Sequence, residues 1–203
     1  KDTIQFFAGN YAQRQVAISI NGPVNELDVS HITDMSSLFE YVAFNEPIGN
    51  WDVRNVTTMK KMFMGSTFNQ NISKWDTRNV RDMEMMFYYN QVFNQSINTS
   101  VQKRKDSNGN DENYKAWNTF NVTKMSNMFT GSTFNQDISS WDTSKVTYMA
   151  FMFESASKFN QKIEEKAIDF TSDGLDSYTA WNTSNVTSMR EMFRGGIVFN
   201  NGK

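Results

Sequence analysis

Apolar residues recur along this chain at fixed spacings, with polar residues between them. Each of five tryptophans is followed by Val at plus five, Met at plus eight, Met-Phe at plus eleven and twelve, and Phe-Asn at plus seventeen or eighteen. These tryptophans are Trp51, Trp75, Trp117, Trp141 and Trp181. A degenerate copy precedes them, with Leu27 in the tryptophan position. The period of 24 residues between Trp51 and Trp75 is typical of a repeat array and not of a globular domain.

Each copy contains two apolar patterns. The run Val-Thr-x-Met-x-x-Met-Phe places apolar side chains at i, i+3, i+6 and i+7, which indicates a helix of about two turns. Threonines such as Thr57 stand at its N-cap, and glycines such as Gly65 stand at its C-cap. The run Phe-Asn-x-x-Ile indicates a short strand that pairs in parallel with the strands of neighbouring copies. The pattern therefore predicts an α/β repeat solenoid.

Two long connections interrupt the array. Ile97 and Trp117 are 20 residues apart, whereas Ile72 and Trp75 are three apart. Turn signals, Asn108-Gly109 and Asp173-Gly174, mark the middle of the two insertions and predict protruding hairpins at about 98–116 and 164–180. The predicted organisation is one elongated domain. A degenerate N-terminal coil that caps the stack is predicted for residues 1–23, and the repeats with their insertions cover 24–203.

The repeated aromatic side chains are predicted to form the core, because stacked copies must bury identical apolar positions. A cofactor-binding or ligand-binding aromatic groove is the less favoured interpretation. The asparagines after Phe are expected to form an inward ladder that satisfies backbone groups, and Asp52, Asp76 and Asp142 are expected to cap turns. The predicted structural residues are the five tryptophans, Phe63, Phe87, Phe129, Phe153, Phe193, Asn69 and Asn135.

Composition excludes several function classes. The net charge of −2 offers no basic field for nucleic acid. The chain has no cysteine, and it has no apolar run of the roughly 18 residues that a spanning helix needs, so direct membrane insertion by this fragment is not expected. The chain starts at Lys1 and stops one step short of its next expected tryptophan, which indicates a fragment of a longer protein.

Signals of catalysis are weak. The single histidine, His31, occupies a turn position that asparagine fills in other copies. Neither a nucleophile elbow nor a phosphate loop is present. Residues 106–112 are rich in oxygen ligands, but their glycine is two positions too early for an EF-hand loop. The sequence predicts no enzyme, no cofactor and no metal. A glycan-processing enzyme would require two carboxylates about 5–10 Å apart beside exposed aromatics.

Binding function is predicted on the hairpins, because loops on a rigid scaffold are the usual carriers of binding. The alternative is that they are solvated decorations without a partner. The candidate partner-binding residues are Lys103, Arg104, Lys105, Tyr114, Phe170, Leu175 and Tyr178.

The motif from Phe134 to Phe153, Phe-Asn-Gln-Asp-Ile-Ser-Ser-Trp-Asp-Thr-Ser-Lys-Val-Thr-x-Met-x-x-Met-Phe, resembles the BspA-like leucine-rich-repeat surface proteins. Together with the Tyr-x-Ala-Trp insertions, it is similar to the tandem-repeat lipoproteins of mycoplasmas. The resemblance covers roughly residues 20–200. It implies a bacterial cell-surface location, a lipid anchor upstream of this fragment, and a role in adhesion or immune variation. The departures are Leu27 for Trp, Arg81 for the capping Thr, and the absence of a lipobox.

The predicted fold class is thus a leucine-rich-repeat-like, right-handed coil of short parallel strands and short helices with about six repeats. The predicted function is an extracellular binding or adhesion module on a bacterial cell surface. Its partner would be a host or neighbouring-cell surface protein or matrix component. The alternative is a structural spacer or an antigenically variable rod without a dedicated ligand. End-to-end self-association through the open C-terminal end is also expected.

Overall fold

The computed structural model describes residues 23–106 and 108–203 of the 203-residue chain. The elements in chain order are the 3-10 helix η1 (Val24–Glu26), strands β1 (Ser100–Lys105), β2 (Asp111–Ala116) and β3 (Lys166–Ile168), the 3-10 helix η2 (Thr171–Asp173) and strand β4 (Tyr178–Ala180). All four strands belong to the insertions. The repeats themselves are built from turns and bends.

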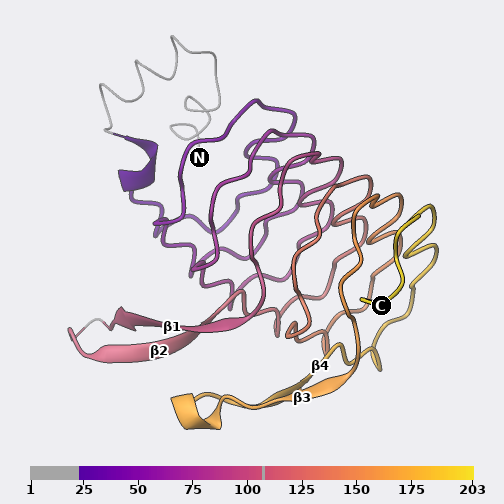
Figure 1. The fold of residues 1–203 in the computed structure, drawn as a ribbon. Helices are drawn as coiled ribbons and strands as arrows, with labels where there is room; N and C mark the ends of the chain where they lie inside the picture. The colour runs from indigo at the N-terminus through magenta and orange to yellow at the C-terminus, as the bar shows by residue number, and fades with distance from the viewer. Residues whose placement is uncertain (1–22, 107) are drawn as a thin grey trace.

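The repeats stack as layers, and the first and last described repeats lie at opposite ends of the stack (Figure 1). Isolated parallel bridges join one residue of each layer to the next, in the order Asp34, Thr58, Asp82, Lys124, Tyr148 and Ser188. The phenylalanine rings of the Met-Phe pairs stack along the same direction, with centroids 5.5–5.7 Å apart. Backbone hydrogen bonds join the same layers, as from Phe63 N–H to Met86 O at 2.9 Å, so ring stacking and backbone bonding act together between layers.

The Met-x-x-Met-Phe segment is a chain of turns and not a helix. Alternate amides bond within the layer and between layers: Met62 N–H donates to Met59 O, whereas Phe63 N–H donates to Met86 O of the next layer. A left-handed residue recurs every four positions, as at Lys61 (φ 58°) and Gly65 (φ 60°). A helix would direct every amide to its own segment, so this backbone exchanges half of its local bonds for bonds between layers.

The Phe-Asn segments of neighbouring layers are joined by asparagine side chains and not by the paired strands that the sequence predicted. The backbone N–H of Asn69 donates to Asn45 Oδ1 in the preceding layer, and the same bond repeats up to Asn200. The asparagines are exposed or half-buried, so the ladder exists but lies at the surface and not inward. Side-chain oxygens thus replace the carbonyls that a parallel sheet would use.

The predicted fold class, an α/β leucine-rich-repeat-like solenoid of parallel strands and short helices, is therefore wrong. The described residues contain no α-helix, and their strands form two antiparallel two-stranded sheets, β1–β2 and β3–β4. Parallel pairing between layers is limited to the isolated bridges. The threonines expected to cap helices act between layers: Thr57 Oγ1 donates to Thr33 O.

The core consists of aromatic and methionine side chains in register from layer to layer. Each tryptophan is buried, and its indole Nε1–H donates to a carbonyl of the preceding layer, as from Trp75 to Ile48 and from Trp141 to Ile97. Of the predicted core phenylalanines, Phe63, Phe87, Phe129 and Phe153 are buried. Phe193, in the last layer, is half-buried. The predicted capping coil lies outside the described residues, apart from Pro23.

Candidate functional site

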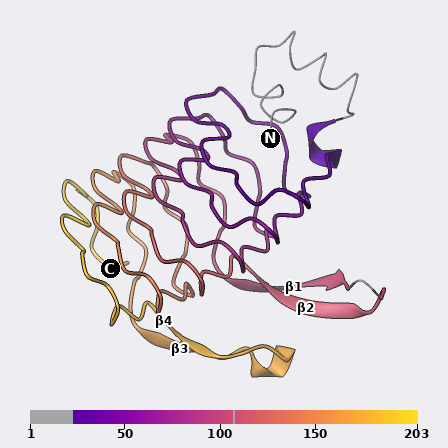
Figure 2. The same cartoon turned by 180° about the vertical axis from the view of Figure 1, so that it is seen from behind.

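Two antiparallel hairpins project from the same side of the stack, as both views show (Figures 1 and 2). We call β1–β2 the first hairpin and β3–β4 the second hairpin. The first is paired over its full length, from Ser100 opposite Ala116 to Lys105 opposite Asp111. The second pairs three residues on each strand and carries the longer loop, with η2 inside it. Both lie inside the two predicted insertions.

The first hairpin is pinned to the stack by a charge network. Arg104 bonds through Nη1 to Asp76 Oδ2 and through Nε to Glu112 on the opposite strand, and its guanidinium lies 4.5 Å from the Tyr114 ring centroid. Asp76 is buried and also pairs with Arg78 at 2.7 Å. Burial lowers the pKa of Arg104, but its hydrogen bonds to Glu112 and Asp76 outweigh this and leave it raised. The Arg104 network therefore keeps a buried carboxylate compensated.

A tyrosine fixes the root of each hairpin. Tyr114 O–H donates to Lys74 O at 2.8 Å, and Tyr178 O–H donates to Ser140 O. Lys74 and Ser140 each precede a core tryptophan. Burial raises the pKa of Tyr114, and it raises the pKa of Tyr178 to about 12 against an opposing hydrogen bond to Thr99. The Tyr-x-Ala-Trp motif is thus the device that joins an insertion to the stack.

Lys115 and Asn113 of β2 couple the first hairpin to the second. Lys115 Nζ donates to Asp176 O and lies 4.9 Å from the Tyr178 ring centroid and 5.4 Å from that of Phe170. Asn113 Nδ2 donates to Asp173 O at 2.9 Å. Burial lowers the pKa of Lys115, while Asp176 and Asp142 oppose the shift. The second hairpin therefore rests on the first.

A groove runs between the coupled hairpins and the side of the stack. It consists of two hollows of about 210 Å³ and about 130 Å³ that share Lys115, Asn118 and Asp176. The larger hollow is also lined by Leu175 and Arg78, and the smaller one by Phe120, Asp142, Ser177 and Tyr178. We call this the hairpin groove. It offers carboxylates, amides, an ammonium group and aromatic edges, a mixture suited to a polar ligand with some apolar surface.

Several side chains that line the hairpin groove are held in place by contacts with neighbouring residues. Phe120 is 43% exposed, and Lys145 Nζ lies 3.6 Å from its ring centroid. Asp142 is buried and accepts the backbone N–H of Ser144, which confirms its predicted role as a turn cap. Asp52 and Asp76 cap the equivalent turns. The groove is therefore pre-formed, which lowers the entropic cost of binding.

The structure gathers some of the candidate binding residues and separates others. Leu175 and Tyr178 line the hairpin groove with Tyr114, while Phe170 contacts it through Lys115. Arg104 is occupied by the Asp76 network, and Lys105 pairs with Asp111 on the exposed outer part of the first hairpin. Lys103 is exposed.

Sequence reasoning missed the residues that join the two hairpins. Lys115 and Asn113 make these contacts, to Asp176 and Asp173. Phe120 was not among the candidates either, and Asp142 was predicted only as a turn cap, although both line the groove. The available signal was position: Lys115 stands beside Tyr114 in the Tyr-x-Ala-Trp motif, where Thr179 stands in the other insertion. That difference between two otherwise similar insertions marks Lys115 as specific to the first.

The described part of the chain offers neither a metal-binding cluster nor a membrane-spanning helix. The described residues contain no group of three or more His, Cys, Asp or Glu side chains placed to hold a metal ion. The oxygen-rich turn at 106–112 uses Asp106 internally, since Asp106 Oδ1 accepts the backbone N–H groups of Asn108 and Asn110. No membrane-spanning helix is found within residues 23–106 and 108–203.

Comparison with protein-family models identifies a family. A family model described as "Mycoplasma protein of unknown function, DUF285" matches residues 9–109 and again residues 100–202. Neither a curated protein nor a solved structure matches the chain. The two matched segments together span nearly the whole chain, and the hairpin groove draws residues from both.

Proposed function

We propose that this chain, which belongs to the Mycoplasma family of unknown function DUF285, is a non-enzymatic binding module that takes its partner in the hairpin groove. The observation that carries the proposal is the coupling of two insertions, about 60 residues apart in sequence, through Lys115 and Asn113. A decoration without a partner has no need for such a pre-formed groove. The proposed partner class is a protein or matrix component on a host or neighbouring cell.

The finer assignment follows the sequence resemblance. We propose that the chain is a BspA-like surface protein of the mycoplasma lipoprotein type, displayed outside the cell on a lipid anchor and used in adhesion. The family match supports the mycoplasma part of this assignment. The repeats supply a rigid body of stacked rings, and the hairpins supply the surface that differs from layer to layer.

A structural spacer or antigenically variable rod is the second candidate. One observation favours it: glutamines beside the asparagine ladder use their side-chain amides in hydrogen bonds to the neighbouring layer. Gln70 Nε2 donates to Asn45 O, and Gln161 Nε2 donates to Asn135. These side chains stabilise the body and offer little to a ligand. A spacer requires only that surface, whereas a binding module requires the hairpin groove.

The test is a binding screen against matrix proteins, immunoglobulin and a glycan panel. The intact chain is compared with a variant in which residues 99–115 and 165–179 are replaced by short links. That variant also removes the bonds of Arg104 and Tyr114 to the stack, so its loss of binding does not separate the groove from the stability of the stack. A point variant in the groove, Phe120→Ser, is therefore run beside it. Its matched control is Tyr148→Ser, an exposed aromatic (50%) that does not line the groove.

The binding module predicts a partner that is retained by Tyr148→Ser and lost by both the link variant and Phe120→Ser. Binding that survives removal of both hairpins would contradict the groove assignment. No binding by any of the variants or by the intact chain would favour the spacer.

A further inference from the structure

Three tyrosines gather on the surface of the stack, outside both hairpins. Tyr41 and Tyr89 hold the same position in two layers, fourteen residues after Leu27 and Trp75 respectively. Tyr41 is 68% exposed and Tyr89 is 50% exposed, and the ring centroid of half-buried Tyr88 lies 4.7 Å from that of Tyr89. We call Tyr41, Tyr88 and Tyr89 the tyrosine strip. It shares no residue with the lining of the hairpin groove.

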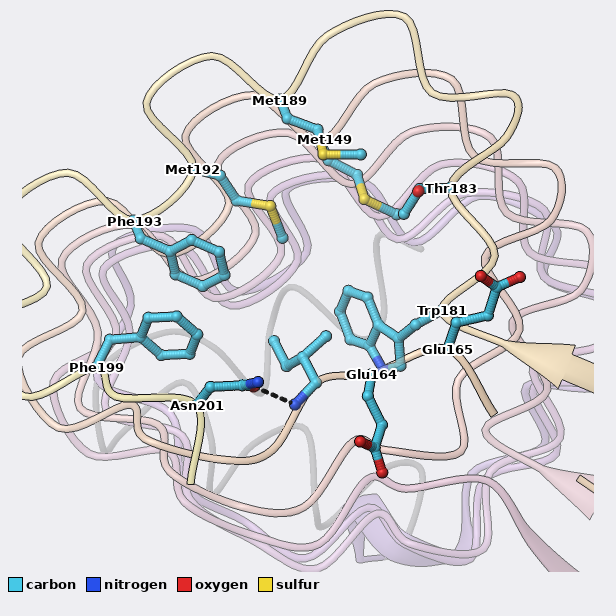
Figure 3. Close-up of a pocket in the computed structure, with 11 residues that line it drawn as sticks. Met149, Glu164, Glu165, Trp181, Thr183, Met189, Met192, Phe193, Phe199 and Asn201 are labelled. Carbon is cyan, nitrogen blue, oxygen red and sulfur yellow. Dashed lines mark hydrogen bonds between the residues drawn. The ribbon is translucent and has the colours of Figure 1, made fainter. Parts of the chain in front are cut away.

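The tyrosine strip is also separate from a cavity of about 440 Å³ on the outer face of the last layer (Figure 3). Apolar side chains such as Trp181 and Phe193 line that cavity, and Asn201 Oδ1 accepts the backbone N–H of Ile163 beside it. The cavity is open because the sequence stops at Lys203, so it marks the end of the given repeats. The tyrosine strip, in contrast, lies on layers that further layers follow.

Glycine makes room for the exposed rings. The position of Tyr41 and Tyr89 is held by Gly65, Gly131 and Gly195 in three other layers, with φ of 60–67°. A Cβ on Gly65 would lie 2.4 Å from Tyr41 Cδ1, and a Cβ on Gly131 would lie 2.9 Å from Tyr89 Cε1. Each ring therefore rests on the glycine of the next layer. Tyr41 and Tyr89 have left-handed φ of 55° and 50°, at a cost of about 1–2 kcal/mol that glycine avoids. The backbone thus favours glycine where these tyrosines stand.

The hydroxyls of the tyrosine strip are available to a ligand. The root tyrosines of the two hairpins donate to carbonyls of the stack. Within residues 23–106 and 108–203, by contrast, the hydroxyls of Tyr41, Tyr88 and Tyr89 form no hydrogen bond. Burial raises the pKa of Tyr88, and the charges of Tyr89, Tyr41 and Glu154 add to this shift, so these polar groups lie within electrostatic reach of one another. The strip therefore offers aromatic surface and hydroxyl groups together.

The charged side chains beside the strip are paired between layers. Glu40 precedes Tyr41 and pairs with Lys61 at 3.5 Å, and Glu154 pairs with Arg194 at 3.7 Å. Paired charges leave little field to attract an ionic ligand. A sugar ring, in contrast, presents C–H groups that pack on the negative face of an aromatic ring, and its hydroxyls can bond the tyrosine hydroxyls. The strip therefore fits a neutral carbohydrate.

The spacing of the exposed rings indicates the kind of carbohydrate. Tyr41 and Tyr89 are two layer steps apart, and these steps measure 5.7 and 5.5 Å between the core phenylalanine centroids. In an extended β-linked hexose chain, every second sugar turns the same face to the same side, and two sugars span a similar length. A protein partner would require a continuous apolar patch, whereas Gly65 lies in the layer between these rings.

We propose that the tyrosine strip binds an extended, neutral, β-linked glycan. The rings of Tyr41 and Tyr89 stack on sugars that turn the same face to the protein, and the hydroxyls of the strip bond sugar hydroxyls. The stacked core holds both rings at a fixed spacing, which lowers the entropic cost of binding. This inference does not depend on the function of the hairpin groove.

The experiment is an aromatic NMR titration of the chain with its 7 tyrosines labelled with carbon-13. The probes are the β-linked hexamers cellohexaose and chitohexaose, the α-linked hexamer maltohexaose, and a proline-rich peptide. Saturable shifts at Tyr41, Tyr88 and Tyr89 are expected with at least one β-linked hexamer, with a Kd on the order of 1 mM. Maltohexaose, which curves, should bind at least about fivefold more weakly.

Variants identify the residues that bind. Tyr89→Gly and Tyr41→Gly introduce the residue that other layers carry at this position, so the fold is retained. Each should weaken binding about five- to tenfold. Tyr148→Ser is the matched control, since Tyr148 is also 50% exposed and lies outside the strip. It should leave the affinity unchanged, as should Phe120→Ser in the hairpin groove.

Four results would overturn the proposal. Two concern the glycans: no saturable shift with either β-linked hexamer, and equal binding of maltohexaose, which would remove the spacing from the recognition. The third is unchanged affinity in both glycine variants. The fourth is a response of the strip to the proline-rich peptide without a response to the glycans, which would identify a protein-docking surface.

Discussion

The two hairpins leave the stack on the same side but are held there differently. The first has six-residue strands, a tyrosine root and a buried ion-pair network through Arg104 and Asp76. The second has three-residue strands and a tyrosine root, and its loop rests on the first through Lys115 and Asn113. A short two-stranded hairpin is marginal on its own. The second hairpin therefore depends on the first, and the hairpin groove depends on both.

The largest expected effect is on the anchor of the first hairpin. Arg104→Met removes one of two guanidinium partners of buried Asp76, and we expect it to lower the free energy of unfolding by about 2–3 kcal/mol. Urea denaturation measures this. Lys105→Met is the matched control on the same strand: its pair with Asp111 is 65% and 75% exposed, so a loss of about 0.5 kcal/mol or less is expected. Equal losses for the two variants would contradict the anchoring role of Arg104.

Removing the root hydroxyls distinguishes the two hairpins. Tyr114→Phe and Tyr178→Phe each delete one hydrogen bond to a carbonyl, for a loss of about 1 kcal/mol. Their local effects should differ. Hydrogen exchange should increase across β3 and β4 in Tyr178→Phe, because few other contacts hold them. Exchange in β1 and β2 should change little in Tyr114→Phe, because Arg104 remains. The reverse pattern would show that the first hairpin is the weaker one.

Alkaline pH tests the same root. The pKa of Tyr178 is raised from 10.0 to about 12, so the folded state keeps a proton that the unfolded state loses. Stability therefore falls as pH rises from about 10 towards about 12. Tyr178→Phe should flatten this decline in the free energy of unfolding measured by urea denaturation. An unchanged slope would mean that the Tyr178 hydroxyl does not titrate from a buried site.

The smallest effect is expected at the contact between the hairpins. Lys115→Met removes the bond to Asp176 O and the cation–π contacts to Tyr178 and Phe170, at a cost of about 0.5–1 kcal/mol. Burial lowers the pKa of the Lys115 ammonium group below its ordinary value of 10.5. The unfolded state therefore binds this proton more tightly than the folded state, and the free energy of unfolding rises as pH rises towards 10.5. Lys115→Met should abolish this rise with pH, and hydrogen exchange should become faster in β3 and β4 alone. Faster exchange in β1 would contradict this assignment.

The sequence predicted which side chains are buried better than it predicted the backbone that buries them. The spacing of Trp75, Phe87 and Met83 identifies core positions because every layer must bury the same places. The same spacing fits both a helix and a chain of turns with a left-handed residue every four positions. Gly65 and its equivalents Gly131 and Gly195 were interpreted as helix caps, but they mark left-handed positions of the turn chain, with φ of 60–67°.

The groove was predictable only in part. Asn-Gly and Asp-Gly turns and the interrupted period place two insertions on the chain. Which of their residues meet depends on contacts between segments about 60 residues apart, such as Lys115 with Asp176, and no local pattern encodes these. Tyr114 and Tyr178 were predicted to bind a partner, and the structure gives both a bond to the stack.

The central claim is that the two hairpins form one rigid element around the groove. Because the chain has no cysteine, spin labels can be placed at Lys103→Cys in the first hairpin and Ser172→Cys in the loop of the second, both exposed, and their separation measured by pulsed electron paramagnetic resonance. The account predicts a single narrow distance distribution that broadens when Lys115→Met is added. A broad distribution in the chain that retains Lys115 would contradict it.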